Sequence, residues 1–188
     1  MVSEAIGDLS KADRSHLAYL AQTHTRILEG GVGASTQILT HLTKGSVVSY
    51  DTDPKWIERI RDHVFPKVGV KGECTFRRYE VGTTRIEGKF DLVFVDLEWS
   101  VRFEFAAKAW ERLAARGVLV FHDARRTKDI SLFMNFWVKN YREIESVEIC
   151  PEDSNLIVFK KRTERCDYEN WHKKEGWTKE QLGIDWLQ

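Results

Sequence analysis

Residues 26–36 read RILEGGVGAST, and they predict three kinds of local structure in succession. Arg26–Glu29 is typical of a short buried strand. The glycines at 30, 31 and 33 allow a tight turn in which the backbone can come close to a ligand. Apolar residues then recur at helical spacing at Ile38, Leu39 and Leu42. The order is therefore strand, glycine turn and helix.

A second strand, residues 46–51, ends in Asp51, and Pro54 follows where the first turn of a helix accepts proline. A helix N-terminus behind a glycine turn favours an anionic group, and a carboxylate at the next strand end can accept two ribose hydroxyls. Together these features indicate an adenosine-bearing cofactor. A P-loop is excluded because no lysine follows the glycines, and a dinucleotide fingerprint fits less well because Thr36 takes its third glycine position.

The rest of the chain predicts an α/β fold. Residues 90–96 and 117–123 are the clearest strands, and residues 74–79 are a weaker one. Two helices are indicated by apolar stripes, both expected to face the core. The stripes are Val101, Phe105, Ala109, Trp110 and Leu113, and then Ile130, Phe133, Met134, Trp137, Val138 and Tyr141.

Residues 147–149 and 156–159 are two further strands, and the link between them is too short for a helical crossover. We therefore expect a Rossmann-like, doubly wound, mostly parallel seven-stranded sheet with a C-terminal antiparallel hairpin. Residues 1–161 form a single domain in this interpretation, with an N-terminal helical segment in residues 1–24 that Ser10 and Asp13 can cap. Residues 162–188, with three tryptophans, are expected to dock on the domain or cover its cleft.

Composition narrows the classes of function. Of 188 residues, 42% are hydrophobic and 31% charged, and 29 Lys and Arg balance 29 Asp and Glu, so general nucleic-acid binding is not expected. No apolar run approaches the roughly 18 residues of a membrane span. The three cysteines lack the spacing of a zinc site, and no secretory apolar segment is found. These features predict that the protein is located in the reducing cytoplasm. The sequence is compatible with an oligomer.

Residues 29–35, EGGVGAS, resemble the first motif of the class I S-adenosylmethionine-dependent methyltransferases, an acidic residue followed by GxG. The resemblance covers residues 25–161, including the terminal hairpin. It implies that Gly31 and Gly33 approach the methionine part of S-adenosylmethionine, that Glu29 holds its ammonium through the loop or a water, and that Asp51 takes the ribose hydroxyls. The implied cofactor-binding residues are Glu29, Gly30, Gly31, Gly33, Ser35, Asp51, Glu80, Val81 and Asp96.

Asp96 and the pair His122-Asp123 follow two strands and resemble the branch that methylates oxygen of small molecules or sugars. In metal-dependent members of this branch similar carboxylates hold Mg²⁺, which makes Asp96 and Asp123 candidate metal ligands. The branch often has Asp-Gly-x-His where this chain reads Asp96-Leu97-Glu98-Trp99. Trp99 thus stands where that motif has the histidine expected to act as the base. The candidates that could take its place are His122, Asp123 and Glu98, and His122 is preferred.

Asp96, His122 and Asp123 are thus the predicted catalytic residues. Trp99, Arg102, Arg125 and Arg126 are candidate substrate-binding residues, since an arginine cluster can clamp a carboxylate or phosphate; a solvated basic loop is the alternative. The predicted activity is methyl transfer to a small-molecule or glycan-like acceptor, at oxygen. Two other functions stay open, a cofactor-binding protein without turnover and an NAD-dependent oxidoreductase.

Overall fold

A computed structural model describes residues 9–68, 72–151 and 153–164 of the chain. The tail prediction for residues 162–188, with Trp171, Trp177 and Trp186, therefore lies almost wholly outside the described residues. The strands of the sheet are β1 (Arg26–Gly30), β2 (Ser46–Asp51), β3 (Glu73–Arg78), β4 (Phe90–Val95), β5 (Leu113–Phe121), β6 (Ile144–Ile149) and β7 (Ile157–Lys161). The helices are α1 (Lys11–Thr23), α2 (Ala34–Leu42), α3 (Pro54–Arg59), a π-helical turn (Ile60–Val64), α4 (Phe65–Val68), α5 (Trp99–Arg112) and α6 (Thr127–Asn140).

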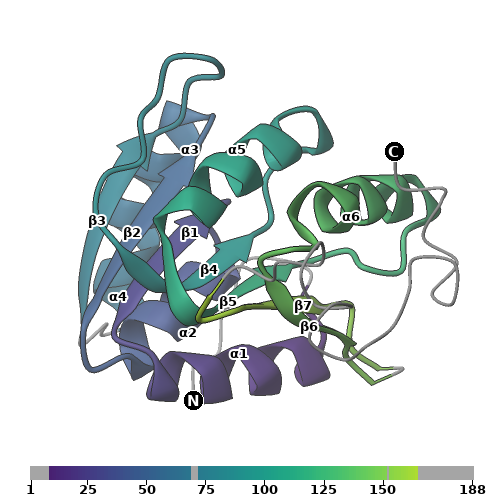
Figure 1. The fold of residues 1–188 in the computed structure, drawn as a ribbon. Coiled ribbons are helices and arrows are strands. Elements are labelled where there is room, and N and C mark those ends of the chain that lie inside the picture. The colour runs from purple at the N-terminus through teal and green to yellow at the C-terminus, as the bar shows by residue number, and fades with distance from the viewer. Residues whose placement is uncertain (1–8, 69–71, 152, 165–188) are drawn as a thin grey trace, which may run out of the picture.

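The seven strands form one sheet in the order β3-β2-β1-β4-β5-β7-β6 (Figure 1). Strands β1 to β5 run parallel, and β7 is antiparallel to both β5 and β6. The predicted Rossmann-like sheet with its C-terminal hairpin is confirmed. Because β1 lies between β2 and β4, the chain changes direction across the sheet at this point, and ligands of open α/β sheets bind at such a switch point.

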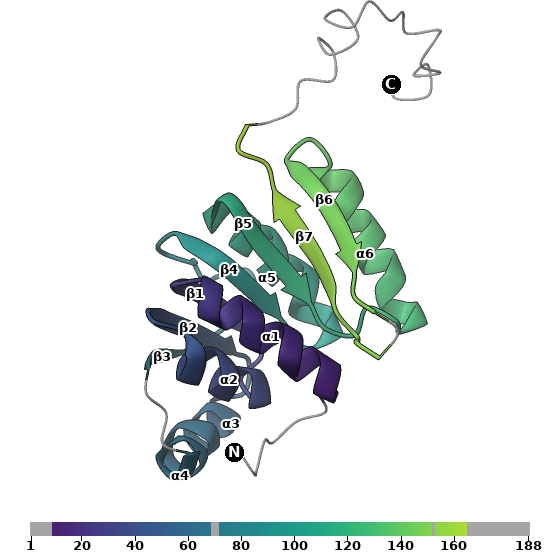
Figure 2. The same ribbon diagram turned by 90° about the horizontal axis from the view of Figure 1, so that it is seen from below.

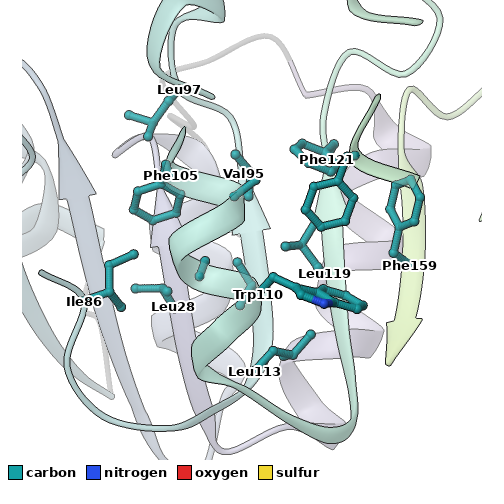
Figure 3. Packing of buried hydrophobic residues seen from close by; sticks show 14 of the residues in the cluster. Leu28, Ile86, Val95, Leu97, Phe105, Trp110, Leu113, Leu119, Phe121 and Phe159 are labelled. Carbon is teal, nitrogen blue, oxygen red and sulfur yellow. The ribbon is translucent and has the colours of Figure 1, made fainter. Parts of the chain in front are cut away.

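Helices cover both faces of the sheet, with α1 and α2 on one side and α5 and α6 on the other (Figure 2). Neighbouring residues of β1 have side chains on opposite faces of the sheet. Ile27 packs with α1 and α2, and Leu28 packs with α5. Phe105 and Trp110 of α5 belong to the same cluster as Leu28 (Figure 3). A strand covered on both faces needs apolar residues at successive positions, which explains the continuous apolar runs in the sequence.

The apolar stripe expected on α5 is buried, but the stripe expected on α6 is wrong apart from Phe133, which is buried. In α6 the buried apolar positions are Leu132, Phe133 and Phe136, whereas four residues of the predicted stripe are 44–64% exposed: Ile130, Met134, Trp137 and Val138. Apolar residues occur on both sides of this helix, so periodicity alone could not choose its packing face. Phe136 faces the core because its ring meets those of Trp110, Phe121 and Phe159 at centroid distances of 5.2–5.4 Å.

Some element boundaries differ from the prediction. Leu113 begins β5 rather than ending α5, and β6 starts three residues earlier than expected. The connection of residues 79–89 between β3 and β4 contains no helix. Within the described part of the chain, no helix is both long and apolar enough to cross a membrane.

The N-terminal helix is hydrogen-bonded to the loop between β6 and β7. Ser10 and Asp13 form the predicted capping box, in which each side chain accepts the other residue's backbone N–H at 3.0 Å. Asp13 is 1% exposed, and its Oδ1 also accepts hydrogen bonds from Ser154 Oγ at 2.8 Å and from the Asn155 N–H at 2.7 Å. The cap of α1 is therefore also a support of the β6–β7 hairpin.

Candidate active site

A cavity of about 240 Å³ lies at the carboxyl ends of β1, β2 and β4. It occupies the switch point of the sheet, where the topology places a ligand. Its walls come from the ends of three adjacent strands, from the first turn of α3 and from Leu9, two residues before α1. The lining residues are Leu9, Gly31, Val32, Gly33, Ala34, Ser35, Asp51, Thr52, Asp53, Trp56, Asp96, Leu97 and Glu98.

Gly31 forms the tightest part of the first wall. Its φ is +104°, and a Cβ built on it would lie 2.4 Å from the carbonyl oxygen of Asp96. The turn is held by hydrogen bonds from the Gly31 N–H to the Tyr50 carbonyl at 2.8 Å and from the Asp96 N–H to the Gly30 carbonyl at 2.7 Å. No other residue fits this position without moving the backbone, because both the conformation and the contact exclude a side chain.

Glu29 lies behind the cavity rather than in its wall. Its side chain is fully buried, and it accepts hydrogen bonds from Ser35 at 2.5 Å and from Ser49. Burial raises the pKa of Glu29 to about 7, although the hydroxyl hydrogen bonds from Ser35, Ser49 and Thr36 oppose that rise. Ser35 lines the cavity. Glu29 therefore has a supporting position, and its hydrogen bond to Ser35 links it to the cavity wall.

Asp51 lines the cavity at the end of β2, as expected. Its Oδ2 accepts the Val32 N–H at 2.9 Å and its Oδ1 accepts the Asp53 N–H at 3.0 Å. Burial raises the pKa of Asp51, and these backbone hydrogen bonds oppose the shift. Each carboxylate oxygen can accept a further bond, so the side chain is oriented by the turn and can still bind hydroxyl groups.

Glu80 and Val81, expected among the cofactor-binding residues, do not line the cavity, and both are exposed. Their loop is nevertheless joined to the site, because the backbone N–H of Tyr79 donates to the carbonyl oxygen of Asp51 at 2.7 Å. The side chain of Glu80 pairs with Arg78 at 3.2 Å. The predicted contact of this loop with a cofactor stays a prediction.

Asp96, Leu97 and Glu98 form the wall opposite Asp51. Asp96 comes directly after β4 and its side chain is 26% exposed, so it is both anchored and accessible. Glu98 is the residue before α5, and Trp99, which is 52% exposed, begins that helix. Asp96 and Glu98 are the carboxylates that this wall offers to a bound molecule.

His122 and Asp123 lie beneath the cavity and do not line it. His122 Nδ1 is 3.3 Å from Asp96 Oδ1 and 3.5 Å from Asp123 Oδ1, and Nε2 is 3.6 Å from Asp13 Oδ2. Burial lowers the pKa of His122, but the hydrogen bond to Asp96 and the charges of the three carboxylates outweigh burial and raise it above its ordinary value. Because His122 is 2% exposed and does not line the cavity, it is not placed to take a proton directly from a molecule bound there.

The three predicted substrate-binding arginines are all engaged within the protein. Arg102 is 2% exposed and lies among carboxylates; its Nε donates to the Leu97 carbonyl at 2.8 Å. Arg125 donates to the carbonyl oxygens of Ser154 at 2.9 Å and Cys150 at 3.0 Å. Arg126, 44% exposed, pairs with Asp123 and, at 2.9 Å, with Asp129. These contacts favour a structural role over the predicted anion clamp.

A cation site was predicted between Asp96 and Asp123. Ligand atoms of Asp96, His122 and Asp123 do lie within 4.8 Å of one another, a spacing that can hold a metal ion. However, Arg102 Nη2 lies 3.3 Å from Asp96 Oδ1 and 3.1 Å from Asp123 Oδ2. Magnesium needs oxygen ligands at about 2.1 Å, so it would have to displace this buried guanidinium. The carboxylates of this site therefore fit the arginine side chain better than they fit Mg²⁺.

Sequence reasoning missed Leu9, Trp56 and Leu97 in the cavity wall and Asp13 below it. Trp56 is held there by its Nε1, which donates to the Val32 carbonyl at 2.6 Å. Its position was open to prediction, because the first turn after a parallel strand lies at the edge where ligands bind. Leu9 and Asp13 carried no such signal, since they reach the site only through the docking of α1.

No model of a known protein family matches the sequence, and no curated protein is detectably similar to it. Solved structures with the same fold are many, and three illustrate them. A methyltransferase-like protein from Silicibacter pomeroyi DSS-3 is 16% identical, with a TM-score of 0.65 over 90% of this chain and 95% of that chain.

An O-methyltransferase from Bacillus cereus, solved in complex with SAH, is 16% identical, with a TM-score of 0.66 over 82% of this chain and 83% of that chain. The O-methyltransferase TomG from Streptomyces achromogenes, involved in tomaymycin synthesis and solved in complex with SAM, is also 16% identical, with a TM-score of 0.65 over 84% and 82% of the two chains. The chain therefore has the fold of the class I S-adenosylmethionine-dependent methyltransferases.

Proposed function

We propose that this chain is an S-adenosylmethionine-dependent methyltransferase that acts at oxygen of a small-molecule acceptor. One observation carries the proposal: a single cavity at the switch point brings together the Gly31 turn, Asp51 and Asp96. The similarity of the fold to O-methyltransferases, two of them solved with SAM or SAH, supports it.

Each wall of the cavity has a distinct binding role. Asp51, oriented by the Val32 and Asp53 N–H groups, accepts the ribose hydroxyls. The main chain of Gly31 and Gly33 leaves room for the methionine part beside Ser35. The N-terminus of α2, which starts at Ala34, favours the negative charge of the methionine carboxylate.

The bound S-adenosylmethionine supplies a methyl group on a sulfonium, which is transferred by in-line displacement. The protein supplies alignment and, for a hydroxyl acceptor, a group that takes the proton as the new C–O bond forms. Asp96 and Glu98 are the carboxylates in the wall after β4, and Asp96 is held in place from behind by Arg102. We therefore assign the proton-accepting role to Asp96 in place of His122.

Calorimetric titration with S-adenosylhomocysteine tests the binding step. Asp51→Asn removes a charge-assisted hydrogen bond of roughly 1.5–3 kcal/mol, so affinity should fall about tenfold to a hundredfold. Asp91→Asn is the matched control: Asp91 also accepts backbone N–H bonds, from Thr25 and Arg26, but at the amino end of the strands. Equal affinities in the two variants would refute the site, and binding of NAD in place of S-adenosylhomocysteine would favour an oxidoreductase.

A cofactor-binding protein without turnover is the alternative function, and the similarity of the fold to O-methyltransferases does not favour it. Release of S-adenosylhomocysteine from the wild type with a panel of hydroxylated small molecules separates the two functions, since a protein without turnover binds the cofactor and releases no product. The glycan-like acceptor, the cytoplasmic location, the oligomer and the docked tail of residues 162–188 stay predictions.

A further inference from the structure

Arg102 stands at the centre of three carboxylates. Its Nη2 lies 3.3 Å from Asp96 Oδ1 and 3.1 Å from Asp123 Oδ2, and its Nη1 lies 3.6 Å from Asp129 Oδ1. Asp123 and Asp129 are 7% and 0% exposed, and Arg102 itself is 2% exposed. Arg102, Asp123 and Asp129 therefore form a buried charge centre, because these three groups cannot turn to bulk water for a partner.

The position of Arg102 is fixed independently of the carboxylates. Its Nε donates to the carbonyl oxygen of Leu97 at 2.8 Å, and its Nη1 donates to that of His122 at 3.3 Å. The residue belongs to α5, whose first turn follows the cavity wall, so the side chain runs back beneath the ends of β4 and β5. Besides Asp129, the guanidinium therefore has four hydrogen-bond acceptors at the ends of β4 and β5: the carbonyl oxygens of Leu97 and His122 and the carboxylates of Asp96 and Asp123.

We propose that the Arg102 guanidinium replaces a divalent cation between Asp96 and Asp123, so that this site works without a metal. The proposal rests on the proposed function for its catalytic part: Arg102 touches no ligand and acts as a positioning residue that holds Asp96 at the cavity. Asp96 is the member of the cluster that reaches the cavity, and its Oδ1 is the atom that Arg102 contacts.

The charges around the cluster agree with a resident monovalent group. Arg126 pairs with both Asp123 and Asp129, and His122 also contacts Asp96 and Asp123, so two arginines and a histidine already face the three carboxylates. A divalent ion added to this set would leave Arg102 buried beside a like charge. Loss of Arg102, in contrast, would leave Asp96 and Asp123 close together and one cation short, which is the arrangement that attracts Mg²⁺.

Metal binding by wild type and Arg102→Ala is the test. After treatment with EDTA, each protein is titrated with Mg²⁺ and Mn²⁺ by calorimetry, and its thermal midpoint is measured with and without the metal. We expect no metal-dependent shift in the wild type. Arg102→Ala should have a lower midpoint that rises when metal is added, with an affinity at least about tenfold above that of the wild type. Millimolar guanidinium should also raise that midpoint in part.

Arg125→Ala is the matched control, because it removes a neighbouring guanidinium whose side-chain hydrogen bonds to described residues go to the Ser154 and Cys150 carbonyls. It should gain no metal affinity. If Arg102→Ala does not fold, Arg102→Gln serves in its place. Stoichiometric Mg²⁺ binding by the wild type that Asp96→Asn abolishes would overturn the proposal, as would Arg102 variants that bind metal no better than Arg125→Ala.

The wild-type titration decides the question if neither Arg102 variant folds. Failure of the proposed function would appear separately, as absent binding of S-adenosylhomocysteine by the wild type, and would leave the metal titrations unaffected. If the proposed function and the replacement of the metal by Arg102 are both correct, turnover of the wild type should be unchanged by EDTA. Arg102→Ala should lose more in kcat than in cofactor affinity, and Mg²⁺ should restore part of the lost kcat.

Discussion

The hydroxyl of Ser35 donates a hydrogen bond of 2.5 Å to Oε1 of Glu29, which ties the first turn of α2 to the end of β1. Ser49 of β2 donates to the other carboxylate oxygen. One buried acidic residue therefore joins the three elements that form the first half of the cavity. The acidic residue of the EGGVG sequence is used as an internal support in this protein.

Glu29 should make stability depend on pH. Its pKa is about 7 in the folded protein against an ordinary 4.5, so below pH 4.5 it is protonated in both states. Between pH 4.5 and 7 only the folded state keeps the proton, and the free energy of unfolding should fall as pH rises, by at most about 1.4 kcal/mol per pH unit. Urea denaturation across pH 5–8 should show this fall in the wild type and lose it in Glu29→Gln. Parallel curves for the two proteins would contradict the assignment.

Gly31→Ala should be far more damaging than Gly82→Ala. Both glycines have positive φ, +104° and +77°, so alanine strains both backbones by about 1–2 kcal/mol. A Cβ at Gly82 meets nothing within 4 Å, whereas one at Gly31 meets the Asp96 carbonyl at 2.4 Å. We expect Gly31→Ala to lose S-adenosylhomocysteine binding in calorimetry, with Gly82→Ala near the wild type. A similar loss in both variants would show that strain alone is responsible.

Asp96→Asn should slow turnover without removing the cofactor. A positioned proton acceptor contributes about 10²–10⁴ in rate, so kcat should fall by that range, while S-adenosylhomocysteine affinity should stay within about threefold of the wild type. Glu98→Gln, the other carboxylate of the same wall, is the comparison. Initial rates with any accepted substrate measure both. A larger loss in Glu98→Gln would transfer the role to Glu98.

The packing of α6 can be checked with two adjacent aromatic residues. Phe136 is 0% exposed and Trp137 is 44% exposed. Phe136→Ala should cost about 3–5 kcal/mol of unfolding free energy, as expected for a buried ring, and Trp137→Ala less than about 1 kcal/mol. Urea denaturation of both variants gives the comparison, and the reverse order would place the other face of the helix in the core.

Local signals in the sequence predicted the part of the site that local structure builds. The Gly31 turn and Asp51 each follow a strand and precede a helix, so neighbouring residues fix where they lie. The burial of His122 and the contacts of Arg102 depend on how α5 and α1 pack against the sheet. Those are contacts between residues far apart in the chain, and periodicity or motif spacing contains no information about them. The same reason explains the wrong face of α6.

Asp13 also bears on the order in which the chain can fold. The partners that satisfy its buried Oδ1, Ser154 and Asn155, lie 141 and 142 residues later in the sequence. During synthesis, α1 therefore leaves the ribosome long before its carboxylate can be satisfied, and docking it early would bury an unpaired charge. The N-terminal helix should accordingly lock into place among the last events, when the final hairpin has emerged and closes the domain.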